Sequence, residues 1–133
     1  MKIQSNQQTF GTRVLMGPSS KEIIVKSPAK KEIFSQIENI KKNGTNDFLI
    51  LGASLDEMSK KVYINAEIFE FIDNKFYVSA FDNGSPLEKK SENGQKRYLD
   101  INVLYQSAKK NMIEYGKVTK DMFDSILHEY QEM

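Results

Sequence analysis

The chain has 133 residues, which suits one domain and is too short for two independent hydrophobic cores. It has no cysteine, which excludes a disulfide framework, a thiolate nucleophile and thiolate-bound zinc or iron–sulfur sites. Lys and Arg number 19 against 18 Asp and Glu, so the net charge of +1 gives no overall attraction to nucleic acid or to an anionic membrane.

The N-terminal residues are polar and lack the apolar segment of a signal peptide, which predicts a cytoplasmic protein. No apolar stretch approaches the roughly 18 residues of a membrane-spanning helix, and we expect no membrane partner. We expect a single domain over 1–133, with residues 1–10 flexible.

The first predicted elements are two short β-prone runs, 12–16 and 22–26, separated by the chain breakers Gly17 and Pro18. This pattern favours a β-hairpin. A helix is predicted next, because Ser27 and Pro28 are typical of a helix start. Apolar residues then recur at helical spacing: Ala29, Ile33, Ile37 and Ile40. Asn43 and Gly44 follow them and are expected to end the helix in a left-handed conformation.

Three strands are predicted in the middle of the chain. Residues 48–53 form a continuous apolar run, which is typical of a central strand covered on both faces. Residues 61–72 and 76–81 are β-prone and flank Asp73 and Asn74, two residues that tolerate positive φ and favour a tight hairpin.

The register of this hairpin makes both of its faces apolar, which is the most informative feature of the sequence. With Asp73 and Asn74 as the loop, the residues on one face are Phe69, Phe71, Phe76, Val78 and Ala80, with Tyr63 further along. The opposite face carries a second apolar row, Val62, Ile64, Ala66, Ile68, Ile72 and Phe81. Each face therefore needs a cover, which a helix, the N-terminal hairpin or another molecule could supply.

The C-terminal third begins with a polar stretch, 82–97, that has no periodicity and predicts a surface loop. Residues 98–103 fit either a strand or a helix. We expect a helix over about 102–115 ending at Gly116, and a last helix capped by Thr119. These two helices would form an αα-hairpin. The predicted fold class is α+β, an antiparallel sheet of about four to six strands packed against a helix from the N-terminal half and this αα-hairpin.

Sequence motifs for catalysis are incomplete. His128 is the only histidine, and we expect it to form a surface pair. A Gly-x-Ser-x-Gly elbow at Ser54 fails because position 56 is Asp. Carboxylate pairs such as Asp56 with Glu57 lack diagnostic spacing. We therefore expect no catalytic residue, no metal and no cofactor, and we favour a protein that is not an enzyme.

The favoured function is a non-enzymatic module that binds a protein partner or its own copy as a homodimer through the apolar hairpin face. The expected partner-binding residues are Tyr63, Phe69, Phe71, Phe76 and Val78.

Two alternatives remain open. One is a small-ligand-binding protein or carboxylate-dependent enzyme, with a pocket between sheet and helices that uses Tyr63, Glu67 or Asp82 with a lysine. The other is a weak RNA-binding module with a basic N-terminal surface, which the near-neutral charge and the acidic last helix disfavour.

Overall fold

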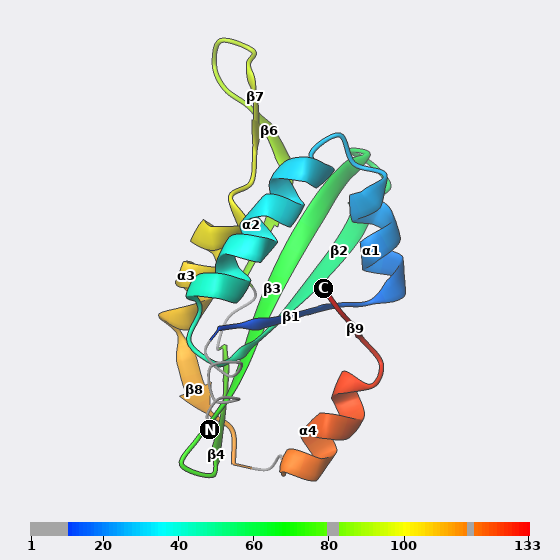
Figure 1. Cartoon of the computed structure of the whole chain (residues 1–133). Coiled ribbons are helices and arrows are strands. Elements are labelled where there is room, and N and C mark those ends of the chain that lie inside the picture. The colour runs from blue at the N-terminus through cyan, green and yellow to red at the C-terminus, as the bar shows by residue number, and fades with distance from the viewer. Residues whose placement is uncertain (1–10, 80–82, 117–118) are drawn as a thin grey trace.

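Two long antiparallel strands form the middle of the fold (Figure 1). The computed structural model describes residues 11–79, 83–116 and 119–133. In chain order the elements are β1 (Arg13–Met16), α1 (Pro18–Val25), α2 (Lys30–Asn43), β2 (Phe48–Asp56), β3 (Lys61–Ile72), β4 (Lys75–Ser79), β5 (Asn83–Pro86), β6 (Glu88–Lys90), β7 (Lys96–Tyr98), α3 (Ile101–Lys109), β8 (Met112–Glu114), α4 (Lys120–Leu127) and β9 (Gln131–Glu132).

The main sheet is mixed rather than purely antiparallel. Its strand order is β8-β4-β3-β2-β1-β9, and β5 pairs with β3 as well. β1 runs parallel to β2, while the other pairs are antiparallel. Parallel neighbours need a crossover connection, which α1 and α2 provide here. The α+β class is thus confirmed, whereas the all-antiparallel sheet is wrong.

The N-terminal hairpin predicted over 12–16 and 22–26 is also wrong in its second strand. The first strand exists as β1, but residues 22–25 belong to α1. Pro18 stands at the start of this helix, where its missing N–H costs nothing. Ile24 is fully buried while the adjacent Val25 is exposed, so burial on one helix face overrides the β propensity of this run.

The helix predicted after Ser27 is confirmed as α2, which begins at Lys30. Ser27 caps the preceding turn instead, because its Oγ accepts a hydrogen bond from the Ala29 N–H at 3.1 Å. Gly44 does not adopt the expected left-handed conformation; its φ is −78°. The requirement for glycine at this position is steric, because a Cβ atom would collide with the Thr12 side chain.

The predicted central hairpin is confirmed in detail. Asp73 and Asn74 have φ values of 51° and 66°, as a two-residue turn between twisted strands requires. Phe71 lies opposite Phe76 and Phe69 opposite Val78. The two faces of β3 therefore carry the residues that the register predicted. Residues 80–82 lie outside the described part of the chain. Residues 1–10, for which flexibility was expected, lie outside it as well.

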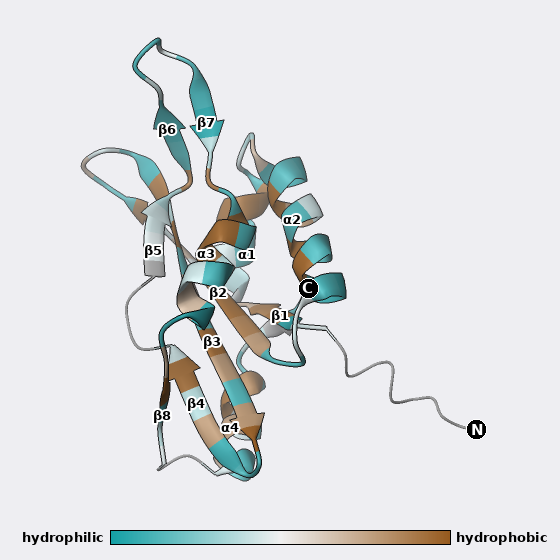
Figure 2. Ribbon diagram, turned by 90° about the vertical axis from the view of Figure 1, so that its left-hand side faces the viewer, coloured by the Kyte–Doolittle hydropathy of each residue, from teal (hydrophilic) through white to brown (hydrophobic). Residues whose placement is uncertain are grey.

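The stretch 82–97 contains strands rather than only a loop. β6 and β7 form a separate two-stranded hairpin, with Glu88 opposite Tyr98 and Lys90 opposite Lys96. It extends away from the body of the molecule and is hydrophilic along most of its length (Figures 1 and 2). A projecting hairpin has no core to cover, which explains why the sequence shows no apolar periodicity there.

The C-terminal αα-hairpin is wrong. α3 ends at Lys109, and residues 112–114 form β8 on the edge of β4. Asp100 caps α3 through a 2.8 Å bond from the Asn102 N–H, so 98–103 contains both the end of a strand and the start of a helix. Thr119 caps α4 as predicted, accepting from the Met122 N–H at 3.2 Å.

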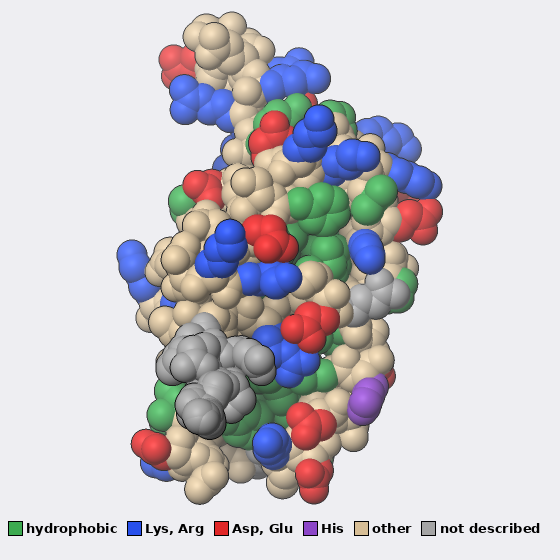
Figure 3. Space-filling view, in the orientation of Figure 1, with side chains coloured by type: hydrophobic (Ala, Val, Ile, Leu, Met, Phe, Trp, Pro, Cys, Tyr) green, Lys and Arg blue, Asp and Glu red, His purple; other side chains and the backbone are tan. Residues whose placement is uncertain are grey.

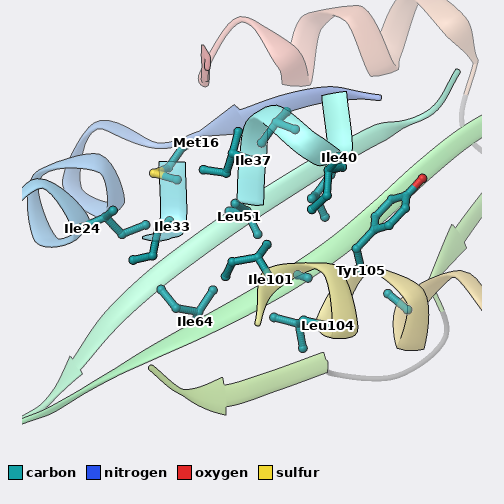
Figure 4. Packing of buried hydrophobic residues seen from close by; sticks show 14 of the residues in the cluster. Met16, Ile24, Ile33, Ile37, Ile40, Leu51, Ile64, Ile101, Leu104 and Tyr105 are labelled. Atoms are coloured by element: carbon teal, nitrogen blue, oxygen red, sulfur yellow. The ribbon is translucent and has the colours of Figure 1, made fainter. Parts of the chain in front are cut away.

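The main core lies between one face of the sheet and three helices, α1, α2 and α3 (Figure 4). Branched side chains of α2 point onto the strands, and α3 packs beside them. The helical members of this core are Ile24, Ile33, Ile37, Ile40, Ile101, Leu104, Tyr105 and Ala108. Among the described residues, no helix is long and apolar enough to span a membrane.

Candidate functional site

The five expected partner-binding residues do not form one cluster. Phe69, Phe71, Phe76 and Val78 lie on the sheet face opposite the main core, near the β3–β4 turn. Phe76 is buried and the other three are half-buried. Tyr63 shares their face by alternation, but it pairs with β5 near the other end of β3.

The protein's own α4 covers this aromatic face. Phe123, which is 1% exposed, inserts its ring among four others. Its ring centroid lies 4.9 Å from that of Phe48 and 5.4 Å from those of Phe69, Phe71 and Phe76. The sequence indicated that a cover was needed, but it did not indicate which element supplies it.

Four large apolar side chains remain exposed around this cluster, and together they define the α4–β8 surface. Ile113 is 50% exposed, Tyr115 47%, Met122 53% and Ile126 42%. Ile113 is the register partner of Val78, and the Tyr115 ring lies 6.5 Å from that of Phe76.

The two α4 residues lie on the flank of the helix that points away from β1. Asp124 contributes to the electrostatic environment of Arg13 in β1, which places that flank of α4 toward β1. Successive helical residues are about 100° apart, so with Phe123 pointing inward, Met122 lies on the opposite flank. Ile126, one turn later, continues the same stripe.

A second candidate site is a groove at the far end of the sheet, which we call the lysine groove. Its volume is about 760 Å³. The C-terminal end of α1, the β2–β3 turn and β6 contribute its walls. Its lining consists of five lysines, one carboxylate, one serine and an apolar floor: Lys26, Lys60, Lys61, Lys89, Lys90, Glu88, Ser27, Ile23, Pro28, Leu55, Val62 and Leu87.

Most of the positive charge in the lysine groove is uncompensated. Lys26 is paired with Glu22 at 2.9 Å, and the groove's carboxylate, Glu88, is paired with Lys96 at 3.6 Å. No ion pair formed by the described residues involves the other four lysines, Lys60, Lys61, Lys89 and Lys90. Lys and Arg side chains gather at this end of the molecule, whereas acidic side chains are more frequent near α4 (Figure 3).

A buried polar network lies between α3 and the start of β2. Asp47, whose side chain is fully buried, accepts from the Thr12 hydroxyl at 2.5 Å and from the Tyr105 hydroxyl at 2.7 Å. Its Oδ2 also lies 2.9 Å from the ammonium group of Lys109, which pairs with Glu70 at 3.2 Å as well. All these polar groups have partners, so the network has the properties of a stabilising element.

The network changes the proton affinity of two of its members. Burial raises the pKa of Tyr105, and the hydrogen bond and charge of Asp47 add to this effect against an opposing bond from Thr12. Burial alone would lower the pKa of Lys109, but the hydrogen bond and charge of Asp47 outweigh it, and the pKa is raised overall.

The residues considered for catalysis are not brought together. Glu67 is exposed on the sheet face opposite the lysine groove, Glu70 belongs to the buried network, and His128 is exposed at the end of α4. Asp56 accepts a 2.6 Å hydrogen bond from Ser59, which lowers the pKa of the carboxyl group. No group of three or more metal-ligating side chains occurs within the described ranges.

Part of the basic N-terminal surface considered for RNA is paired with carboxylates. Arg13 pairs with Glu132 at 2.8 Å and lies over the ring of Phe48, with 5.0 Å between its guanidinium carbon and the ring centroid. Lys41 donates to the Met133 carbonyl at 2.6 Å and pairs with Glu38. These contacts hold Arg13 and Lys41 beside the C-terminal residues Glu132 and Met133.

Sequence inspection missed both the lysine groove and the buried network. The Lys60-Lys61 and Lys89-Lys90 doublets are visible in the sequence, but 27 residues lie between them and each resembles ordinary solvated surface. For the network, the signal was a single aspartate, Asp47, directly before an apolar strand, which alone does not indicate burial.

Comparisons with protein families, with curated proteins and with solved structures found no match for this chain.

Proposed function

We propose that this protein is a non-enzymatic protein-binding module that associates with a second copy of itself through the α4–β8 surface. The observation that carries this proposal is the group of four large apolar side chains, each about half exposed, around an aromatic cluster. They offer roughly 300 Å² of apolar area, about the size of the largest apolar patch on a typical monomer, which is often functional.

The strand β8 favours a copy of the same chain as the partner. It is the outermost strand at its end of the sheet, and it pairs only with β4 among the described strands. An edge strand with few charges is a template for pairing with another strand. Two β8 strands related by a twofold axis would continue the sheet and bring Ile113 and Tyr115 of both copies together.

The predicted binding residues take an indirect part in this arrangement. Phe69, Phe71, Phe76 and Val78 form the floor beneath α4 and beside β8, and the more exposed residues around them would make the contact. Tyr63 lies too far along β3 to belong to the same surface.

The test is light scattering after size-exclusion chromatography at about 100 μM protein. Wild type is expected to be a dimer, because Kd values in the micromolar range are common for interfaces of modest area. Ile113→Glu and Met122→Glu are each expected to yield a folded monomer, since both side chains are half exposed and a charge there leaves the core intact.

The matched control is Val103→Glu, because Val103 is also a large exposed residue, at 62%, but lies on α3 at the other face of the sheet. This variant should remain a dimer. A wild-type protein that is monomeric at 100 μM, or a dimer that both α4–β8 variants leave intact, would contradict the proposal.

A further inference from the structure

The lysine groove exists because the sheet extends beyond the helices that cover it. Leu55 and Val62 are register partners near the ends of β2 and β3, on the same face as the main core. The core helices do not reach them fully, so Leu55 is 51% exposed. An apolar floor is thereby left open between the α1–α2 junction and the base of the β6–β7 hairpin.

The rim of this groove selects for negative charge. Four of its lysines have no carboxylate partner in the described part of the chain, and the one carboxylate of the lining is occupied by Lys96. Like charges gathered around a concave site raise the local concentration of an oppositely charged ligand. An anionic ligand would therefore reduce the repulsion among these ammonium groups.

A strand edge lies along one wall. β6 pairs only with β7 among the described strands, and β6 residues line the groove while β7 residues do not. The edge of β6 that does not pair with β7 therefore leaves backbone N–H and C=O groups with which an extended chain in the groove would pair. Adding a peptide strand to such an edge is a common recognition mode, in which alternate side chains enter pockets.

We infer that the lysine groove is a docking site for an extended acidic segment of a partner protein. The segment lies against β6, its apolar side chains rest on Leu55, Val62 and Leu87, and its carboxylates meet Lys60, Lys61, Lys89 and Lys90. Single-stranded nucleic acid fits less well, because no aromatic side chain lines the groove to stack on a base. This site is at the opposite end of β3 from the α4–β8 surface, so it does not depend on self-association.

The test is fluorescence anisotropy of a labelled peptide in which Asp or Glu alternates with Leu, Val or Ile, titrated with the full-length protein. Saturable binding is expected, with a dissociation constant that increases when salt is raised from about 50 to 500 mM. The double variant Lys61→Glu/Lys89→Glu should weaken binding at least about tenfold, because it places like charges against the peptide.

Two controls isolate the groove. Lys30→Glu/Lys31→Glu makes the same change in net charge at exposed lysines of α2 outside the groove, and it should alter binding less than about threefold. Leu55→Asn should weaken binding without a change of charge. Circular dichroism and the unfolding midpoint confirm that each variant is folded.

Several outcomes would overturn the inference. No binding of the labelled peptide at about 1 mM protein would do so, since weak specific complexes are detected there. Equal binding of a matched peptide with Asn and Gln in place of the acidic residues would show that the groove does not recognise the peptide's negative charge. Equal weakening by both double variants would show nonspecific attraction. A uridine oligonucleotide or phosphatidylserine vesicles that displace the peptide and bind the groove more tightly would assign it to another ligand class.

Discussion

Replacing Asp47 by alanine should destabilise the protein more than any other single change to a charged residue among those described. The carboxylate is fully buried and has three partners, Thr12, Tyr105 and Lys109, at 2.5, 2.7 and 2.9 Å. Alanine leaves two hydroxyl groups and one partly buried ammonium group without their acceptor. Only Lys109 keeps a second carboxylate, Glu70, at 3.2 Å.

The expected cost is about 4–6 kcal/mol. Breaking a buried ion pair from one side typically costs about 3–5 kcal/mol, and Glu70 places the charge contribution at the lower end of that range. Each lost hydroxyl hydrogen bond adds about 0.5–1.5 kcal/mol. Since domains of this size are stable by about 5–15 kcal/mol, the variant would lose a large fraction of its stability.

Urea unfolding followed by circular dichroism measures this cost as a change in midpoint at constant slope. The control Glu57→Ala, in an exposed turn, should change stability by less than about 0.5 kcal/mol. Asp47→Ala combined with Lys109→Met should cost about 1–3 kcal/mol less than the sum of the single changes, because the ammonium group is then no longer left without its partner. A loss below about 1 kcal/mol for Asp47→Ala would refute the network's role.

Two further predictions concern the aromatic cover and the pH dependence. Phe123→Ala should lower the free energy of unfolding in urea by about 3–5 kcal/mol, since it empties the centre of the aromatic cluster. The control Ile126→Ala removes a half-exposed side chain and should lower it by less than about 1.5 kcal/mol. Equal losses would contradict the packing. Stability should also fall as pH rises above about 10, because the raised pKa values of Lys109 and Tyr105 let the folded state keep protons that the unfolded chain releases. Urea midpoints from pH 8 to 11 test this, and Tyr105→Phe should reduce the fall; a flat profile would contradict it.

The sequence predicted the elements whose signals are local. The α2 helix followed from its apolar spacing, the β3–β4 hairpin and its register followed from Asp73 and Asn74, and the α4 cap followed from Thr119. In each case the residues that specify the element are close together in the sequence, so propensity and spacing are sufficient to predict it.

The errors arose where distant contacts override local preference. Residues 22–25 are β-prone, but they become helical because the crossover from β1 to β2 needs helices and buries Ile24. Residues 112–114 fit a helical stripe, but they join the sheet because β4 has an edge to be paired.

The candidate sites divide in the same way. The two apolar faces of β3, and the need to cover both, were determined by the alternation of residues along a single strand. Only the tertiary structure decided that α4 covers one face and that the two lysine doublets meet over Leu55. It also decided that Asp47 contacts Thr12, Tyr105 and Lys109. These groups lie tens of residues apart, and neither hydrophobic periodicity nor charge pattern encodes which distant segments fold against one another.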